Sequence, residues 1–160
     1  MPSFVTMQLA RWIISAAHVL AGGAWFGAML YSLVVVHPRA RSFFSSSRQF
    51  EEFIAHLAAG ARWKVLSGAA FIALTGIGLL LLPGAEDASN GKKACVIAKT
   101  ALFAIAVSLF CFTSWRLWPA RTLASVEEIP KFQKSFRRIA VTLLVLVAVS
   151  MVLGVLSSHL

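Results

Sequence analysis

Four long runs of apolar residues constrain this chain more than any other feature of its sequence. They cover residues 12–36, 65–85, 94–115 and 139–160, and the only Lys, Arg, Asp or Glu within them is Lys99. A helix needs roughly 20 apolar residues to cross about 30 Å of hydrocarbon. The sequence therefore predicts an all-α fold, an integral membrane four-helix bundle forming one domain over residues 1–160. The composition, 59% hydrophobic and 13% charged, argues against a soluble or disordered chain.

The basic residues are distributed unevenly between the two sides of this predicted bundle. Eleven Lys and Arg residues flank or occupy the first and third loops, whereas the N-terminal tail and the second loop hold three. Short basic loops remain in the cytoplasm. Both termini should therefore lie outside, on the periplasmic side of a bacterial inner (plasma) membrane. The net charge of +9 suits contact with anionic lipid, and four spans argue against a nucleic-acid partner.

Two loop segments have helical patterns. Phe50, Phe53, Ile54 and Leu57 share one helical face, which predicts an interfacial amphipathic helix at about 47–61. The segment 125–128 has capping-box spacing and precedes Pro130, which predicts a short cytoplasmic helix before the fourth span.

Small residues give each span a face that can approach a neighbouring helix closely. Ordinary helix packing explains them, and the alternative is that glycines make room for a flat cofactor. They are Gly23 and Gly27 in the first span, Gly68, Ala69, Thr75, Gly76 and Gly78 in the second, Ala98, Ala101, Ala104 and Ser108 in the third, and Ser150 and Gly154 in the fourth.

Two ionisable residues inside the spans are the main functional candidates, because such residues are costly in lipid. His18 lies six residues into the first run, roughly 9 Å of helix, and Lys99 lies five into the third, roughly 7–8 Å. Both runs start from the same side, so the two residues lie at a common depth.

The surroundings of His18 leave two interpretations open. His18, Gly22, Trp25 and Met29 share a helical face, and a histidine beside a glycine and an aromatic ring can ligate haem iron. The alternative is a neutral histidine bonded to a Ser or Thr of another helix. Lys99 either snorkels to the interface or, when neutral, serves as an iron ligand or proton carrier.

The remaining candidates are weaker. Met7, Cys95 and His159 all lie near the outer surface and could form a soft copper site, although Cys and Met are also common packing residues. His37 precedes Pro38, where exit from the first helix explains it, and His56 is expected to be solvated.

Two segments resemble a known family. Residues 17–38, from Ala-His-Val-Leu-Ala-Gly-Gly-Ala-Trp-Phe-Gly to Val-Val-Val-His-Pro, resemble the first helix of the CopD (copper-resistance D) domain and of the related HemJ-type protoporphyrinogen oxidase. The segment Val-Ile-Ala-Lys at 96–99, continuing to Trp118-Pro119, resembles their lysine-bearing third helix. The resemblance implies that His18 and Lys99 are associated with haem.

These observations lead to an expected function and three alternatives. We expect a membrane-embedded protein that binds haem b through His18 and Lys99, beside Gly22 and Trp25, and that performs electron transfer or porphyrin-linked redox chemistry. Its partner would be a membrane or periplasmic redox protein or a larger membrane complex. The alternatives are a copper-handling protein, a protoporphyrinogen oxidase and a structural small subunit of a membrane complex.

Overall fold

The computed structural model describes residues 4–82, 89–125 and 127–159, and this part of the chain is helical with no strand. The elements are α1 (Phe4–Tyr31), η1 (Ser32–Val36), α2 (His37–Phe43), α3 (Ser47–Ala58), α4 (Ala61–Leu81), α5 (Asn90–Phe112), η2 (Thr113–Leu117), α6 (Trp118–Thr122) and α7 (Ile129–Ser158). Four stretches are long and apolar enough to cross a membrane: Val5–Phe43, Ala61–Leu81, Asn90–Thr122 and Ile129–Ser158. The predicted all-α bundle of four spans is confirmed.

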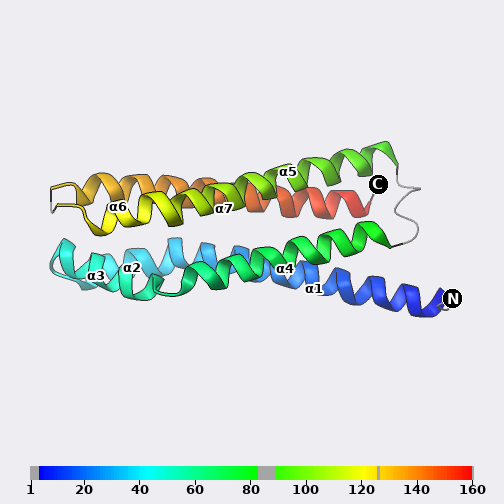
Figure 1. Ribbon diagram of the computed structural model, residues 1–160, viewed down its shortest axis with the longest axis horizontal. Coiled ribbons are helices and arrows are strands. Elements are labelled where there is room, and N and C mark those ends of the chain that lie inside the picture. The colour runs from blue at the N-terminus through cyan, green and yellow to red at the C-terminus, as the bar shows by residue number, and fades with distance from the viewer. Residues whose placement is uncertain (1–3, 83–88, 126, 160) are drawn as a thin grey trace.

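The four long helices lie side by side as two pairs (Figure 1). α1 packs along α4, α5 packs along α7, and α1 also contacts α7. α1 begins and α7 ends at the same end of the bundle, which we call the termini end. The opposite end, with α2, α3 and α6, contains the two loop regions rich in Lys and Arg, and we call it the basic end.

The first and third spans continue through a proline instead of ending there. Each passes through a π-helical turn, η1 before Pro38 and η2 before Pro119. In these turns the N–H groups of His37 and Trp118 bond to the carbonyls of Ser32 and Thr113, five residues back. A proline ring clashes with the carbonyl of a regular helix four residues earlier, and a wider turn relieves this clash. The prediction that the helix exits at His37 was therefore wrong.

Arg62 of α4 completes the hydrogen bonding of η2. A π-helical turn would direct the Ser114 carbonyl to the N–H of residue 119, but Pro119 has none. Arg62 Nη2 donates to this carbonyl at 2.6 Å, and its guanidinium lies 4.7 Å from the centre of the Trp115 ring. This contact joins the two helix pairs at the basic end.

α3 confirms the predicted amphipathic helix, although it ends at Ala58 rather than near residue 61. The Ser46 hydroxyl accepts a hydrogen bond from the Gln49 N–H and caps the helix start. Phe50 and Ile54 are buried with Ala40 against the rest of the basic end, whereas Phe53 and Leu57 are exposed. One part of the apolar face of α3 is thus buried against the protein, and the other part is exposed at its surface.

Over the described residues 127–158, no short helix separate from α7 precedes the fourth span. Ser125 donates to a carboxylate oxygen of Glu128 from both its N–H and its hydroxyl, each at 3.0 Å, and α7 then runs unbroken from Ile129 to Ser158. The segment 131–138 contains neither Gly nor Pro, so nothing in it interrupts the helix. The prediction of an independent helix was wrong, while the capping contact at its start is present.

The bundle core forms where α5 meets α7. Ala106 is completely buried between Leu143 and Val147, and Trp25 and Met29 of α1 pack against this cluster. Many other apolar side chains of the long helices face outward, as expected where lipid covers the protein.

The third span packs through a different face from the one that its small residues predicted. Ala98, Ala101, Ala104 and Ser108 are exposed, whereas Phe103, Ala106 and Leu109 point inward. Small residues can face lipid without cost, and larger side chains on the opposite face make the more extensive contact with α7. Lys99 belongs to this inward face.

A buried ion pair joins three elements at the basic end. Arg121 of α6 donates to both carboxylate oxygens of Glu51 on α3, at 2.6 and 3.0 Å, and its side chain is 5% exposed. Gln133 of α7 donates to the same carboxylate at 2.9 Å. The Arg121 guanidinium also lies 4.6 Å from the centre of the Phe136 ring. These contacts hold α3 against the α6–α7 turn.

The same contacts determine the charge state of Glu51. Burial alone would raise its pKa, but the hydrogen bonds from Arg121 and Gln133 and the charge of Arg121 outweigh this effect. Together they hold the pKa of Glu51 below its ordinary value of 4.5.

Replacing Glu51 should destabilise the protein far more than replacing its neighbour. Glu51→Gln leaves the buried Arg121 cation without its counter-charge, and we expect a loss of about 3 kcal/mol in the free energy of unfolding. Glu52→Gln is the matched control, because its pair with Arg48 is exposed and should contribute less than about 0.5 kcal/mol. Reversible unfolding in detergent measures the stability of both variants. Equal losses in Glu51→Gln and Glu52→Gln would contradict a stabilising role for the Glu51–Arg121 pair.

Glu51 should also make stability depend on pH. Since its folded pKa lies below 4.5, its contribution is complete above that value and disappears as the pH falls through the folded pKa. Thermal unfolding of the wild type should therefore shift to lower temperature in this acid window, whereas Glu51→Gln should give a flatter profile. If the pH profiles of the wild type and Glu51→Gln were parallel, Glu51 would not be the cause of the loss of stability in acid.

Candidate functional site

His18 is held against the second span by a hydrogen bond inside the bundle. Its Nδ1 lies 2.9 Å from the hydroxyl oxygen of Thr75 on α4, and both residues lie within membrane-spanning helices. The bond between a histidine and a Ser or Thr of another helix is thus the contact that the sequence left open as an alternative. It engages only one of the two ring nitrogens.

The surroundings of Thr75 offer its hydroxyl proton other acceptors than His18. The Thr75 hydroxyl lies 2.8 Å from the Phe71 carbonyl and 3.0 Å from the Ile72 carbonyl, so two backbone acceptors compete with Nδ1 for its single proton. When a carbonyl takes that proton, the hydroxyl oxygen accepts a proton from Nδ1 of His18. The neutral ring protonated at Nδ1 keeps a lone pair on Nε2, which is the form that binds a metal.

Gly76 provides the space that the imidazole needs beside α4. A methyl group on Gly76 would lie 3.2 Å from Cε1 of His18 and 3.7 Å from its Nδ1. Gly78, half a turn further on, lies next to Ile14 of α1 in the same way. The predicted role of glycines in close helix packing therefore holds at these two positions.

The predicted His18 face of α1 points into the bundle. His18, Gly22, Trp25 and Met29 are all half-buried. The Trp25 ring meets the ring of Phe103 on α5 edge to face, with the centres 5.7 Å apart. A side chain on Gly22 would have no neighbour within 4 Å. The bundle is thus packed at the level of Trp25 and has room beside Gly22, nearer the termini end.

Lys99 lies on the inward face of α5 at nearly the same level as His18. Lys99 is one turn before Phe103 and His18 is two turns before Trp25, and both helices run from the termini end. From the Trp25–Phe103 contact, these steps of about 6 and 10 Å place the two residues within about 5 Å in depth. Lys99 is half-buried and its charge acts on His18 across the bundle. The structure therefore brings the two candidates into one electrostatic environment.

The described part of the structure gives no cluster that contains the copper candidates. Met7 and Cys95 are half-buried and His159 is exposed. Among the described residues, no group of three or more His, Cys, Asp or Glu side chains is placed to hold a metal ion. A copper site from these residues stays a prediction. His56 is exposed, as expected.

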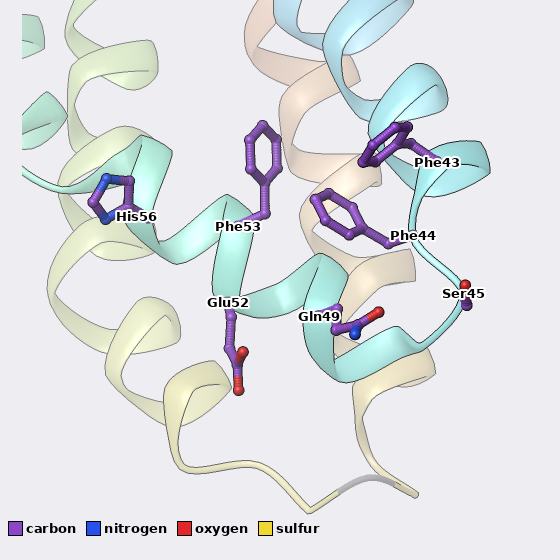
Figure 2. Close-up of a pocket in the computed structure, with 7 residues that line it drawn as sticks. All are labelled: Phe43, Phe44, Ser45, Gln49, Glu52, Phe53 and His56. Carbon is purple, nitrogen blue, oxygen red and sulfur yellow. The ribbon is translucent and has the colours of Figure 1, made fainter.

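An open hollow at the basic end lies apart from His18 and Lys99 (Figure 2). It is lined by Phe43, Phe44, Ser45, Gln49, Glu52, Phe53 and His56. Phe44 lies 5.2 Å from both Phe43 and Phe53, measured between ring centres, and Figure 2 shows Glu52 pointing away from these rings. The rings pack on one another, and no polar groups converge there as they would in a ligand site.

Sequence reasoning did not pair Thr75 with His18. Thr75 and Gly76 stood out only as small residues, because the rotation of α4 about its axis is not encoded in spacing within one helix. A Thr followed by Gly in an apolar span is a weak signal for a histidine partner on a neighbouring helix. The Arg121–Glu51 pair was also missed, since 70 residues separate its members.

Comparison of this chain with models of protein families, with curated proteins and with solved structures finds no match. The function of the protein is therefore inferred from the site itself.

Replacing Gly76 should disturb the packing of His18. In Gly76→Ala the new methyl group would press on the imidazole, and we expect this variant to be less stable than Gly68→Ala by about 1–2 kcal/mol. Gly68 is the matched control, because it lies on the same helix and a methyl group there meets nothing within 4 Å. Unfolding in detergent compares them, and equal stability would mean that the imidazole is not confined by α4.

Proposed function

We propose that this protein binds haem b within the membrane and takes part in electron transfer or porphyrin-linked redox chemistry. His18 is the proposed axial ligand through Nε2, and Lys99 is the second ligand or a proton partner. The observation that supports this most is the His18–Thr75 hydrogen bond, because it fixes the ring through Nδ1 and does not use Nε2.

The hydrogen bonding of His18 is of the kind that supports a histidine ligand of haem iron. Metal-ligating histidines almost always donate their second ring N–H to an oxygen, which fixes the tautomer and raises the basicity of the ligating nitrogen. Thr75 offers that oxygen when the Phe71 or the Ile72 carbonyl takes its own proton. The Nδ1 bond is therefore the kind of support that an axial histidine has in haem proteins.

The position of Gly22 would admit the edge of a flat ligand beside His18. A methyl group on Gly22 would meet nothing within 4 Å, while the Trp25–Phe103 contact closes the bundle about two turns of α1 beyond His18. Aromatic and aliphatic side chains at that level exclude water from the side of the basic end. When bound, haem would supply a one-electron couple, and the protein would orient it and control its hydration.

Lys99 contributes the second polar group. An amine on the inward face of a span, near an imidazole, has few uses in ordinary packing. In its neutral form it can bind iron through Nζ, and in its charged form it can exchange a proton with a bound acceptor. Either role requires Lys99 and His18 to lie at a similar depth along the bundle, as they do.

We further propose that the chain resides in a bacterial inner membrane with the termini end outside. The basic end holds the two loop regions rich in Lys and Arg, which remain in the cytoplasm of such membranes. The proposed site then lies nearer the outer surface, where a periplasmic or membrane-embedded redox partner would exchange electrons with it.

Absorption spectroscopy tests this proposal. The protein purified from haem-sufficient cells should show a Soret band, and His18→Ala should abolish it, whereas the exposed control His56→Ala should leave it intact. Thr75→Val keeps the ligand but removes its support, and it should weaken haem affinity about 10–100-fold. Colourless wild-type protein, or a Soret band that survives in His18→Ala, would refute the proposal.

A further inference from the structure

A second polar feature lies on the outer surface of α7 at the basic end. Lys134, Arg137 and Arg138 line a shallow hollow together with Val141 and Thr142. These positions follow the spacing of one helix face, and all five residues are exposed. Three cationic side chains therefore converge on one small area of surface.

These three cations lack acidic partners. Elsewhere at this end, Arg48 pairs with Glu52, Arg121 pairs with Glu51, and Arg62 donates to the Ser114 carbonyl. No Asp or Glu of the described chain forms an ion pair with Lys134, Arg137 or Arg138. The hollow is thus a concentration of positive charge that the protein itself does not neutralise.

The same helix face becomes apolar immediately after the hollow. The uncharged run of α7 begins at residue 139, and Val141, Val145, Val149 and Val152 continue the face with 42%, 54%, 43% and 66% of their surface exposed. A cationic hollow that continues into an exposed apolar stripe matches a molecule with an anionic head and a hydrocarbon tail. The hollow also lies where a spanning helix leaves the hydrocarbon.

We propose that this face binds one anionic phospholipid from the leaflet at the basic end. Its phosphate occupies the hollow between Arg137, Arg138 and Lys134, and an acyl chain lies along the valine stripe. Guanidinium groups suit this role because their planar donors can pair with two phosphate oxygens at once. The inference is independent of haem, since the hollow and the His18 site share no residue.

Lipid binding to the full chain in a neutral detergent tests the proposal. Native mass spectrometry with added phosphatidylglycerol or phosphatidylcholine should show preferential retention of phosphatidylglycerol by the wild type. The triple variant Lys134→Gln, Arg137→Gln and Arg138→Gln should raise the dissociation constant for phosphatidylglycerol at least about tenfold, because each basic residue near a membrane surface adds to anionic lipid attraction.

The matched control removes three exposed charges from the same end at other positions. Arg39→Gln, Arg41→Gln and Lys131→Gln together should change the affinity by less than about twofold, since they do not line the hollow. An equal loss in both triple variants would overturn the proposal in favour of a general charge effect. Equal binding of phosphatidylcholine to the wild type would also overturn it, and so would full competition by equimolar inorganic phosphate, which would indicate a site for the free anion.

Discussion

The structure depends on one constraint, which is that polar groups buried in hydrocarbon or inside the protein must be satisfied by the protein itself. His18 meets Thr75 across α1 and α4, Arg62 supplies the donor that Pro119 lacks, and Arg121 neutralises Glu51. Each contact links helices that are distant in sequence. Since lipid offers no hydrophobic drive for helix association, such contacts and close packing determine which helices become neighbours.

The length and composition of the apolar runs were sufficient to predict four spans, because crossing hydrocarbon imposes a minimum helix length. The spacing of His18, Gly22, Trp25 and Met29 placed them on one face of the first span, and in the structure all four are half-buried. The inward face of α5 was mispredicted from its small residues, since in lipid neither face of a helix is marked by polarity. The partnership of Thr75 with His18 and the Glu51–Arg121 pair could not be predicted from the sequence. Both depend on the relative rotation and register of separate helices, which spacing within one helix does not determine.

The contact between His18 and Thr75 unites two interpretations that sequence alone set against each other. The hydrogen bond to Thr75 gives the half-buried His18 ring a polar partner inside the bundle. When Thr75 accepts the proton of Nδ1, Nε2 carries a lone pair, which is the form that binds a metal. The same contact is therefore compatible with a purely structural histidine and with a metal ligand. What distinguishes them is whether the open face beside Gly22 is occupied by lipid or by a planar cofactor.

The lengths of the helices have a consequence for how the molecule meets its surroundings. The first continuous helical stretch has 39 residues, which is about 58 Å at 1.5 Å per residue, nearly twice the thickness of the hydrocarbon layer. The hydrocarbon layer therefore cannot enclose the whole of this stretch, and several helical turns must lie outside it.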